Sequence, residues 1–219
     1  MEHITSTDID QTVDTVVTIG NFDGVHMGHR KLIETAKEYA EKLSLKLVVL
    51  TFNPHPMFVF GDRKNAALIM SPEEKCITME KMGVDTYIEY PFDREFASMS
   101  PEDFAIKLLF ERLRSKVVVV GYDYHFGSKQ KGDDKLLEKL GKEYGVKTVF
   151  IPKVIYEGIR VSSTRIRECI LNRDIDCADR LLTEPYFIVG RVEKGKRIGR
   201  TIGFPTANIL AHPDQLFPP

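Results

Sequence analysis

The stretch "TVVTIGNFDGVHMGHRKLIETA", residues 15–36, runs from a β-branched segment through a glycine-containing turn into a segment with helical spacing. The short apolar run from Val16 to Ile19 predicts a strand. The segment from Lys31 to Leu43 repeats apolar residues at the spacing of one helix face, which predicts a helix. Strand, loop and helix in that order form the unit from which parallel α/β sheets are built. This stretch therefore sets the fold class.

The same alternation continues along the chain. "LKLVVLTF" (45–52) and "KVVVVG" (116–121) are nearly continuous apolar runs, as expected for strands covered on both faces. Serine and proline precede two of the helical segments and predict where they begin. Further strands are predicted at 86–90 and 147–152, and helices at 72–82, 104–113 and 134–144. Residues 15–152 thus predict an α/β fold with five parallel strands in a doubly wound, Rossmann-like sheet.

The sequence changes character towards its end. "RVSSTRIRECI" (160–170) predicts a helix with a hydroxyl-rich start, and a second short helix follows through Leu182. From residue 186 the pattern alternates apolar and polar residues and is rich in glycine, which indicates antiparallel β structure. We therefore predict one domain over residues 1–185 and the start of a β-barrel domain over residues 186–219.

Composition limits the possible functions. The chain has 31 Lys and Arg against 32 Asp and Glu, a formal net charge of -1, so no global basic field favours nucleic acid. No run of about 18 apolar residues occurs, and "MEHITSTDID" lacks the features of a leader, so neither membrane spanning nor export is expected. The three cysteines are spaced too irregularly for a zinc knuckle or a disulfide framework and predict reduced thiols in a cytoplasm. The sequence sets no expectation for the oligomeric state.

Residues suited to chemistry follow three of the predicted strands. Ligands of doubly wound sheets bind beyond the carboxyl ends of the strands. "GNFDGVHMGH" follows the first strand, "NPHP" the second and "GYDYHFG" the fourth. The sequence therefore predicts a site at this edge of the sheet.

His26 and His29 allow three interpretations. A metal pair would need further His, Cys or carboxylate ligands at suitable spacing, and nothing nearby completes such a set. A polar turn that caps a helix is the plainest alternative. In the third interpretation the unpaired N–H groups of a helix start bind phosphate and the imidazoles extend that site, with Gly28 allowing close approach.

"SSTRIR" (162–167) could form a second phosphate clamp. Its hydroxyls sit at a helix start, and Arg167 lies four residues beyond Ser163, on the same helix face. Alone, it would more often be a helix cap followed by a solvated arginine. Two such segments in one α/β domain favour a nucleoside triphosphate held at both ends, with its central phosphorus open to attack.

Five motifs together resemble a known family. "GNFDGVHMGH", "TFNPHP", "GYDYHFG", "VSSTRIR" and "GRTIGFPTAN" occur in the order found in prokaryotic bifunctional riboflavin kinase/FMN adenylyltransferases, also called FAD synthetases. The histidine motif alone is shared by other nucleotidyltransferases. The resemblance covers essentially the whole chain and implies transfer of AMP from ATP to FMN, which gives FAD and pyrophosphate and requires Mg2+.

The resemblance also implies roles for individual residues. His26 and His29 would be catalytic, binding the ATP phosphates and stabilising the transition state. Asn53 stands where many relatives are expected to carry an acidic residue. Further ATP phosphate contacts are implied for Asn21, Gly28, Ser162, Ser163, Thr164 and Arg167. Loops lining the flavin and adenine pockets are implied at Phe22, Asp23, Asn53, Pro54, His55, Pro56, Gly121, Asp123 and Phe126.

The final segment resembles the start of the riboflavin kinase module. There Thr206 and Asn208 would contribute to a Mg2+ and ATP site if the domain were complete. Because the family's kinase modules continue for roughly another hundred residues, we expect no riboflavin kinase activity in this chain. We also expect residues 186–219 to be loosely ordered and prone to aggregation.

Two alternatives stay open from the sequence. The chain could be another nucleotidyltransferase of the same fold with a different phosphorylated acceptor, or a flavin- or nucleotide-binding protein without turnover. Small-molecule substrates, and neither nucleic acid nor membrane, are the expected partners in each case.

Overall fold

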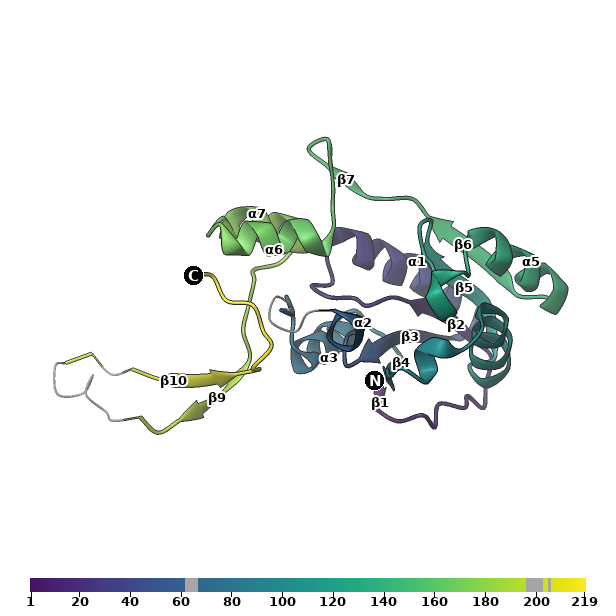
Figure 1. Cartoon of the computed structure of the whole chain (residues 1–219), viewed down its shortest axis with the longest axis horizontal. Helices are drawn as coiled ribbons and strands as arrows, with labels where there is room; N and C mark the ends of the chain where they lie inside the picture. The colour runs from purple at the N-terminus through teal and green to yellow at the C-terminus, as the bar shows by residue number, and fades with distance from the viewer. Residues whose placement is uncertain (62–66, 196–202, 205) are drawn as a thin grey trace.

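The computed structural model describes residues 1–61, 67–195, 203–204 and 206–219. Its centre is a six-stranded, fully parallel sheet with the order β1-β4-β3-β2-β5-β6 (Figure 1). The strands are β1 (Glu2–Ile4), β2 (Thr15–Ile19), β3 (Lys46–Asn53), β4 (Thr86–Pro91), β5 (Ser115–Gly121) and β6 (Lys147–Ile151).

The order of the strands reverses between β2 and β5. The chain first builds outward from β2 through β3 to β4, then returns to place β5 on the other side of β2. Such a switch point leaves a crevice at the carboxyl ends of the two central strands, where ligands of doubly wound sheets bind. The loops after β2 and β5 carry the predicted site residues.

The edge strand β1 was not expected from the sequence. The five predicted strands are confirmed as β2 to β6, and β1 adds a sixth beside β4. Glu2, His3 and Ile4 pair with Thr86, Tyr87 and Ile88 of β4. Because three residues are too few to show a period of two, the strand forms through its partner rather than through its own pattern.

Helices cover both faces of the sheet. α1 (Met27–Leu43) and α3 (Pro72–Lys81) pack on one face, where Ile33, Val49 and Tyr87 are fully buried. The other face is covered by α4 (Pro101–Asp103), η3 (Phe104–Arg112) and α5 (Asp134–Tyr144). η3 has π-helical hydrogen bonding in place of the α-helix expected there. The doubly wound prediction is therefore confirmed.

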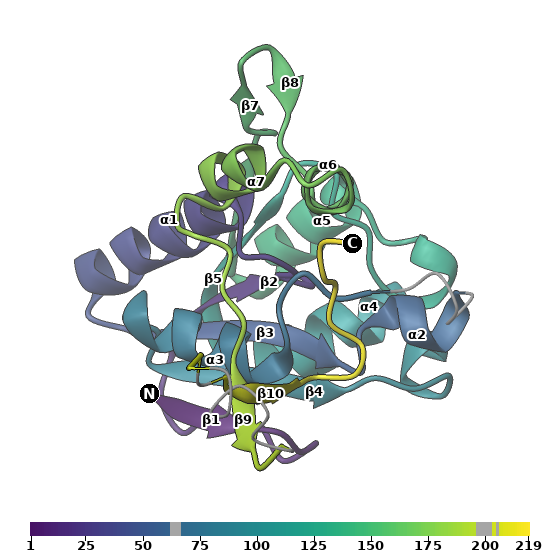
Figure 2. The ribbon, with the colours of Figure 1, turned by 90° about the vertical axis from the view of Figure 1, so that its left-hand side faces the viewer.

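Two further helices close the switch point. α6 (Ser163–Leu171) and α7 (Ile175–Leu182) form a third apolar core with Ile69 and Leu216. A short hairpin of β7 (Ile155–Tyr156) and β8 (Ile159–Arg160) precedes α6 and projects from the molecule (Figures 1 and 2). α2 (Pro56–Phe60) follows β3.

The last segment forms two strands, β9 and β10, which we call the arm together with the described residues between them, and it then returns towards the rest of the molecule. β9 (Gly190–Glu193) and β10 (Asn208–Ala211) pair antiparallel, as predicted, and they extend away from the sheet (Figure 1). After β10 the chain runs back towards α6, and both views show its end there (Figure 2). Gln215 and Leu216 are buried, so this part is packed rather than loose. Residues 199–202 and 205 of "GRTIGFPTAN" lie outside the described residues.

Candidate active site

The turn after β2 places two imidazoles at the start of α1. His26 is the N-cap residue, and its Nδ1 accepts a hydrogen bond from the His29 backbone N–H at 3.3 Å. The two rings stack with their centroids 3.7 Å apart and their planes at 10°. Phe22 supports them from below, its ring meeting that of His29 edge-on at 5.2 Å. The helix therefore starts four residues earlier than predicted, and both histidines belong to its cap.

Both histidines are neutral at physiological pH. Burial, opposed by one backbone hydrogen bond and aided by the nearby Arg160 charge, lowers the pKa of His26 to about 4. Burial, followed by His26 and Lys75, lowers the pKa of His29 well below its usual range. Because His26 Nδ1 accepts a hydrogen bond, its proton sits on Nε2. At the start of α1 the site thus presents neutral N–H donors rather than charged imidazoles.

A second helix start faces the first across the crevice. Ser162 caps α6 by accepting the N–H of Arg165 at 3.3 Å. The Ser163 hydroxyl donates to the backbone carbonyl of Asp23 at 2.9 Å, which ties the two turns together. Unpaired N–H groups at both helix starts favour anions. The two segments that the sequence singled out are therefore adjacent in space.

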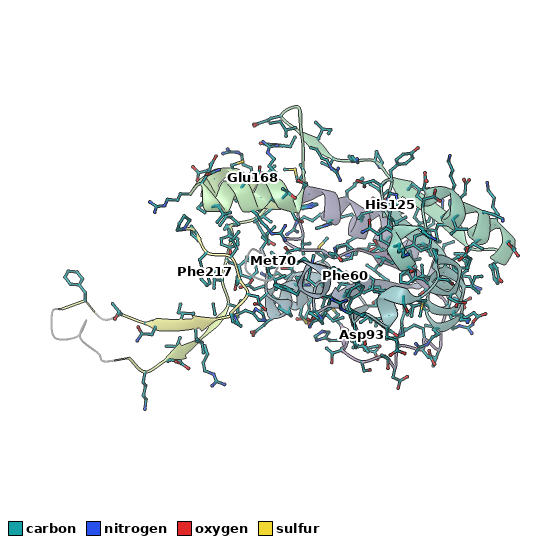
Figure 3. All side chains as sticks on the ribbon, in the orientation of Figure 1. Phe60, Met70, Asp93, His125, Glu168 and Phe217 are labelled. Carbon is teal, nitrogen blue, oxygen red and sulfur yellow. The ribbon has the colours of Figure 1, made fainter. Side chains whose placement is uncertain are left out.

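One cavity of about 870 Å³ joins these segments. Of the predicted site residues, those that line it are Asn21, His26, Gly28, His29, Pro56, Gly121, Asp123, Phe126, Ser162 and Ser163. Figure 3 labels two further lining residues, Phe60 from α2 and His125 from the loop after β5.

Two of the expected pocket residues are buried instead. Phe22 and Asp23 are 0% and 1% exposed and are not among the residues that line this cavity. Phe22 fills the apolar space beneath the turn. The Asp23 carboxylate accepts hydrogen bonds from the Ile69 and Met70 amides and pairs with Arg167. Burial raises the pKa of Asp23, opposed by the charges of Arg167 and Lys75.

Other predicted residues lie behind or outside the cavity. Arg167 does not line it, because its Nε donates to the Ala67 carbonyl at 2.9 Å and its Nη2 to Asp23. Thr164 is exposed. In the segment 53–56, the Asn53 side chain donates to Glu89 at 2.9 Å and His55 caps α2. Of the four residues Asn53, Pro54, His55 and Pro56, only Pro56 lines the cavity. Thr206 and Asn208 are exposed on the arm.

Two cations were missed by sequence reasoning. Arg160 of β8 and Lys153 both bind the Asp123 carboxylate, at 2.7 and 3.3 Å, within the cavity. Burial raises the pKa of Asp123, but the Lys153 hydrogen bond and the Arg160 charge outweigh it and lower that pKa. Arg160 directly precedes the "VSSTRIR" motif, and Lys153 lies outside all five motifs. Their position gives the end of the cavity beside the two helix starts positive charge.

The far end of the cavity is aromatic. Phe60 and Phe92 meet edge-on with their centroids 5.9 Å apart, and Phe104 and Phe126 lie 5.7 Å apart. Other aromatic lining residues are Phe52, Phe96 and Tyr124. A concave, mostly apolar wall with polar groups at one end suits a ligand with a planar ring system and a charged tail. Only Phe126 of this wall was singled out from the sequence.

Fold and site together define a class, the Rossmann-like α/β proteins that hold phosphate groups at helix starts beside a switch point. Family models then give a closer assignment. Residues 8–165 match the FAD synthetase model and residues 182–219 the riboflavin kinase model. The chain belongs to the FAD synthetase family.

Individual relatives agree with this. The chain is 41% identical over 194 residues to the bifunctional riboflavin kinase/FMN adenylyltransferase of Escherichia coli K12, covering 89% of this chain and 62% of that protein. The Bacillus subtilis protein of the same name is 37% identical over 212 residues, covering 96% and 66%. The chain therefore spans just under two thirds of the length of these curated relatives.

A solved structure has the same fold. A Streptococcus pneumoniae protein whose structure is titled as a macrolide-efflux protein is 33% identical with a TM-score of 0.85, covering all of this chain and 72% of that one. Within the parts of this chain that the structure describes, no helix is both long and apolar enough to cross a membrane.

Proposed function

We propose that this chain is an FMN adenylyltransferase, transferring AMP from ATP to FMN. One observation carries the proposal: two helix starts, with neutral imidazoles on one and hydroxyls on the other, meet at the head of an aromatic cavity. A triphosphate fits the head and a flavin ring fits the aromatic end. The names of the relatives support the same acceptor.

The reaction is an in-line displacement at the α-phosphorus. A phosphate oxygen of FMN forms the new P–O bond while the bond from the α-phosphorus to the bridging oxygen breaks, and pyrophosphate leaves. His26 and His29 donate N–H groups to oxygens on which charge develops, and Arg160 and Lys153 offset the charge of the departing phosphates. Because both imidazoles are already neutral, they need lose no proton to act.

Mg2+ fits this site only in company with ATP. Among the described residues, no group of three or more His, Cys, Asp or Glu side chains could hold a metal. Of the residues that line the cavity, Asp123 is the one with a carboxylate. That carboxylate is already paired with Arg160 and Lys153. Mg2+ commonly binds through substrate phosphates and few protein oxygens, so we propose that it enters on the triphosphate.

Three subsidiary proposals accompany this function. We place the domain boundary after residue 185, close to residue 182, where the match to the riboflavin kinase model begins. FMN and ATP are the proposed small-molecule partners. The cytoplasm is the proposed compartment, supported by three free cysteines.

Product analysis tests the function. The purified chain is incubated with ATP, MgCl2 and FMN, and separately with riboflavin or other phosphorylated acceptors. We expect FAD and pyrophosphate in equal amounts from FMN alone. Turnover with another acceptor but not FMN would indicate a different nucleotidyltransferase, and FMN binding without any product would indicate a binding protein.

A further inference from the structure

Two segments beyond residue 185 close over the FAD synthetase core. They are residues 186–189, which lead into β9, and residues 212–216, which follow β10; we call them together the strap. Leu216 packs in the core of α6 and α7, and the Tyr186 hydroxyl donates to the Leu216 carbonyl. Both segments fall within the match to the riboflavin kinase model.

One buried carboxylate fastens the strap. Glu74 of α3 is 0% exposed. Its Oε1 accepts the Val189 N–H at 2.6 Å, and its Oε2 accepts the Gln215 side-chain N–H at 2.7 Å and the Ser71 N–H at 2.9 Å. A buried carboxylate is costly without such donors. The strap therefore supplies two of the three hydrogen bonds that allow Glu74 to be buried.

The strap also holds the chain just before α3. The Leu68 N–H donates to the Asp214 carbonyl, and the Leu216 N–H donates to the Leu68 carbonyl, both at 2.8 Å. Leu68 thus pairs with the returning segment on both of its backbone groups. Met70 lies two residues after Leu68, and Phe217 directly follows Leu216. Figure 3 shows both on the side of the molecule from which the arm leaves.

Residues 67–70 form hydrogen bonds to Asp23, in the turn before α1, and to Arg167 of α6. The Ile69 and Met70 amides donate to Asp23 Oδ1 at 2.9 and 3.2 Å, and the Ala67 carbonyl accepts from Arg167. Asp23 precedes His26 by three residues, and its carbonyl accepts the Ser163 hydroxyl. The strap is therefore joined to the two helix starts by hydrogen bonds and by short stretches of backbone between them.

We propose that Glu74 and Gln215 are positioning residues for AMP transfer. They hold the strap in place, and the strap fixes residues 67–70 beneath the turns that carry His26 and Ser163. The inference rests on the proposed function. Neither side chain lines the cavity, so each acts through the backbone of Leu68 to Met70. The kinase-like segment is thus part of the scaffold of the adenylyl-transfer site.

The test compares Gln215→Leu and Glu74→Gln with Glu73→Gln, a matched change on the neighbouring, exposed residue of α3. In folded protein, we expect both strap variants to speed hydrogen exchange at the Ile69 and Met70 amides. We expect ATP affinity to fall roughly 10-fold or more while FMN affinity stays within about twofold. Glu73→Gln should match the unmodified chain in all three measurements.

Two results would overturn the proposal. One is unchanged hydrogen exchange at Ile69 and Met70 together with unchanged ATP affinity in Gln215→Leu. Gln215→Leu is the milder variant and serves as the test if Glu74→Gln fails to fold. The other is an equal loss of ATP and FMN affinity, which indicates general destabilisation. Exchange and ATP binding need no FAD formation, so a wrong assignment of the acceptor would leave this test standing.

Discussion

At the scale of single residues, the site works through uncharged donors. His26 and His29 stack face to face, and two protonated imidazoles at a centroid distance of 3.7 Å would repel each other. Burial removes that conflict by keeping both neutral. Positive charge comes instead from Arg160 and Lys153, which both pair with the Asp123 carboxylate.

Removal of one imidazole tests this division of roles. We expect His29→Ala to lower kcat for FAD synthesis about 100-fold or more, because a donor to the developing charge is lost. FMN binding should change little, since the aromatic wall lies at the other end of the cavity. Steady-state kinetics and titration of flavin fluorescence measure the two effects. Equal losses in turnover and FMN binding would contradict the role.

The low pKa of His26 predicts an acid-sensitive fold. Its pKa is about 4 in the folded chain against 6.5 for a free imidazole. Above pH 6.5 neither state binds this proton, so the contribution is nil; between pH 6.5 and 4 only the unfolded chain binds it, so stability falls. The loss reaches about 3 kcal/mol below pH 4.

Urea unfolding at pH 7 and pH 4.5 measures that loss. The unmodified chain should lose about 2–3 kcal/mol more than His26→Gln between these two pH values. Other titrating groups are common to both proteins and cancel in the comparison. An identical pH dependence in the two proteins would show that His26 titrates normally when folded.

Site residues were predictable where they follow a strand or open a helix. His26, His29, Ser162 and Ser163 combine capping chemistry with a position after a strand or turn, and they line the cavity. Asp23 and Arg167 looked equally polar in the sequence, but they are used to neutralise each other inside the protein. Which polar residue meets a ligand and which meets another residue depends on long-range packing, which has no local sequence signal.

At the scale of elements, the start of α1 explains the glycine between the histidines. A Cβ atom built on Gly28 would lie 3.2 Å from His26 Cε1 and 3.3 Å from Nδ1. Those distances are tighter than ordinary van der Waals contact. Any side chain at residue 28 would therefore displace the imidazole that caps the helix.

Gly28→Ala should separate activity from stability. Alanine gains up to about 1 kcal/mol of helix propensity over glycine, which offsets the crowding. We expect the melting temperature to stay within a few degrees while kcat falls about 10-fold, because the His26 ring moves from its donor position. Glu34→Ala, an exposed site on the same helix, should leave both unchanged. Full activity in Gly28→Ala would mean that the ring position is not critical.

Predicted elements match the structure where the pattern is long. The strands of "LKLVVLTF" and "KVVVVG" end within a residue or two of β3 and β5, because continuous apolar runs admit only a buried strand. β1 and the β7–β8 hairpin were missed, since segments of two or three residues take their structure from their neighbours. The π-helical form of η3 likewise leaves no mark on apolar spacing.

At the scale of the whole molecule, the arm carries an exposed apolar face. Val192 and Ile209 are directly paired across β9 and β10, so their side chains lie on the same face of the ribbon. They are 68% and 59% exposed. Among the described residues, the ribbon's own two strands form its whole sheet, so apolar side chains and strand edges are exposed together.

This face predicts concentration-dependent association. We expect the chain to self-associate between micromolar and near-millimolar concentrations, as measured by sedimentation velocity. The double variant Val192→Thr/Ile209→Thr should reduce that association. Threonine keeps the β-branched shape that suits a strand. Leu171→Gln, which removes an isolated exposed apolar residue from α6, is the matched control and should have no effect. FAD synthesis should be the same in all three proteins, because the strap, rather than the arm, contacts the core. If the threonine pair left association unchanged, the contact surface would have to lie elsewhere on the molecule.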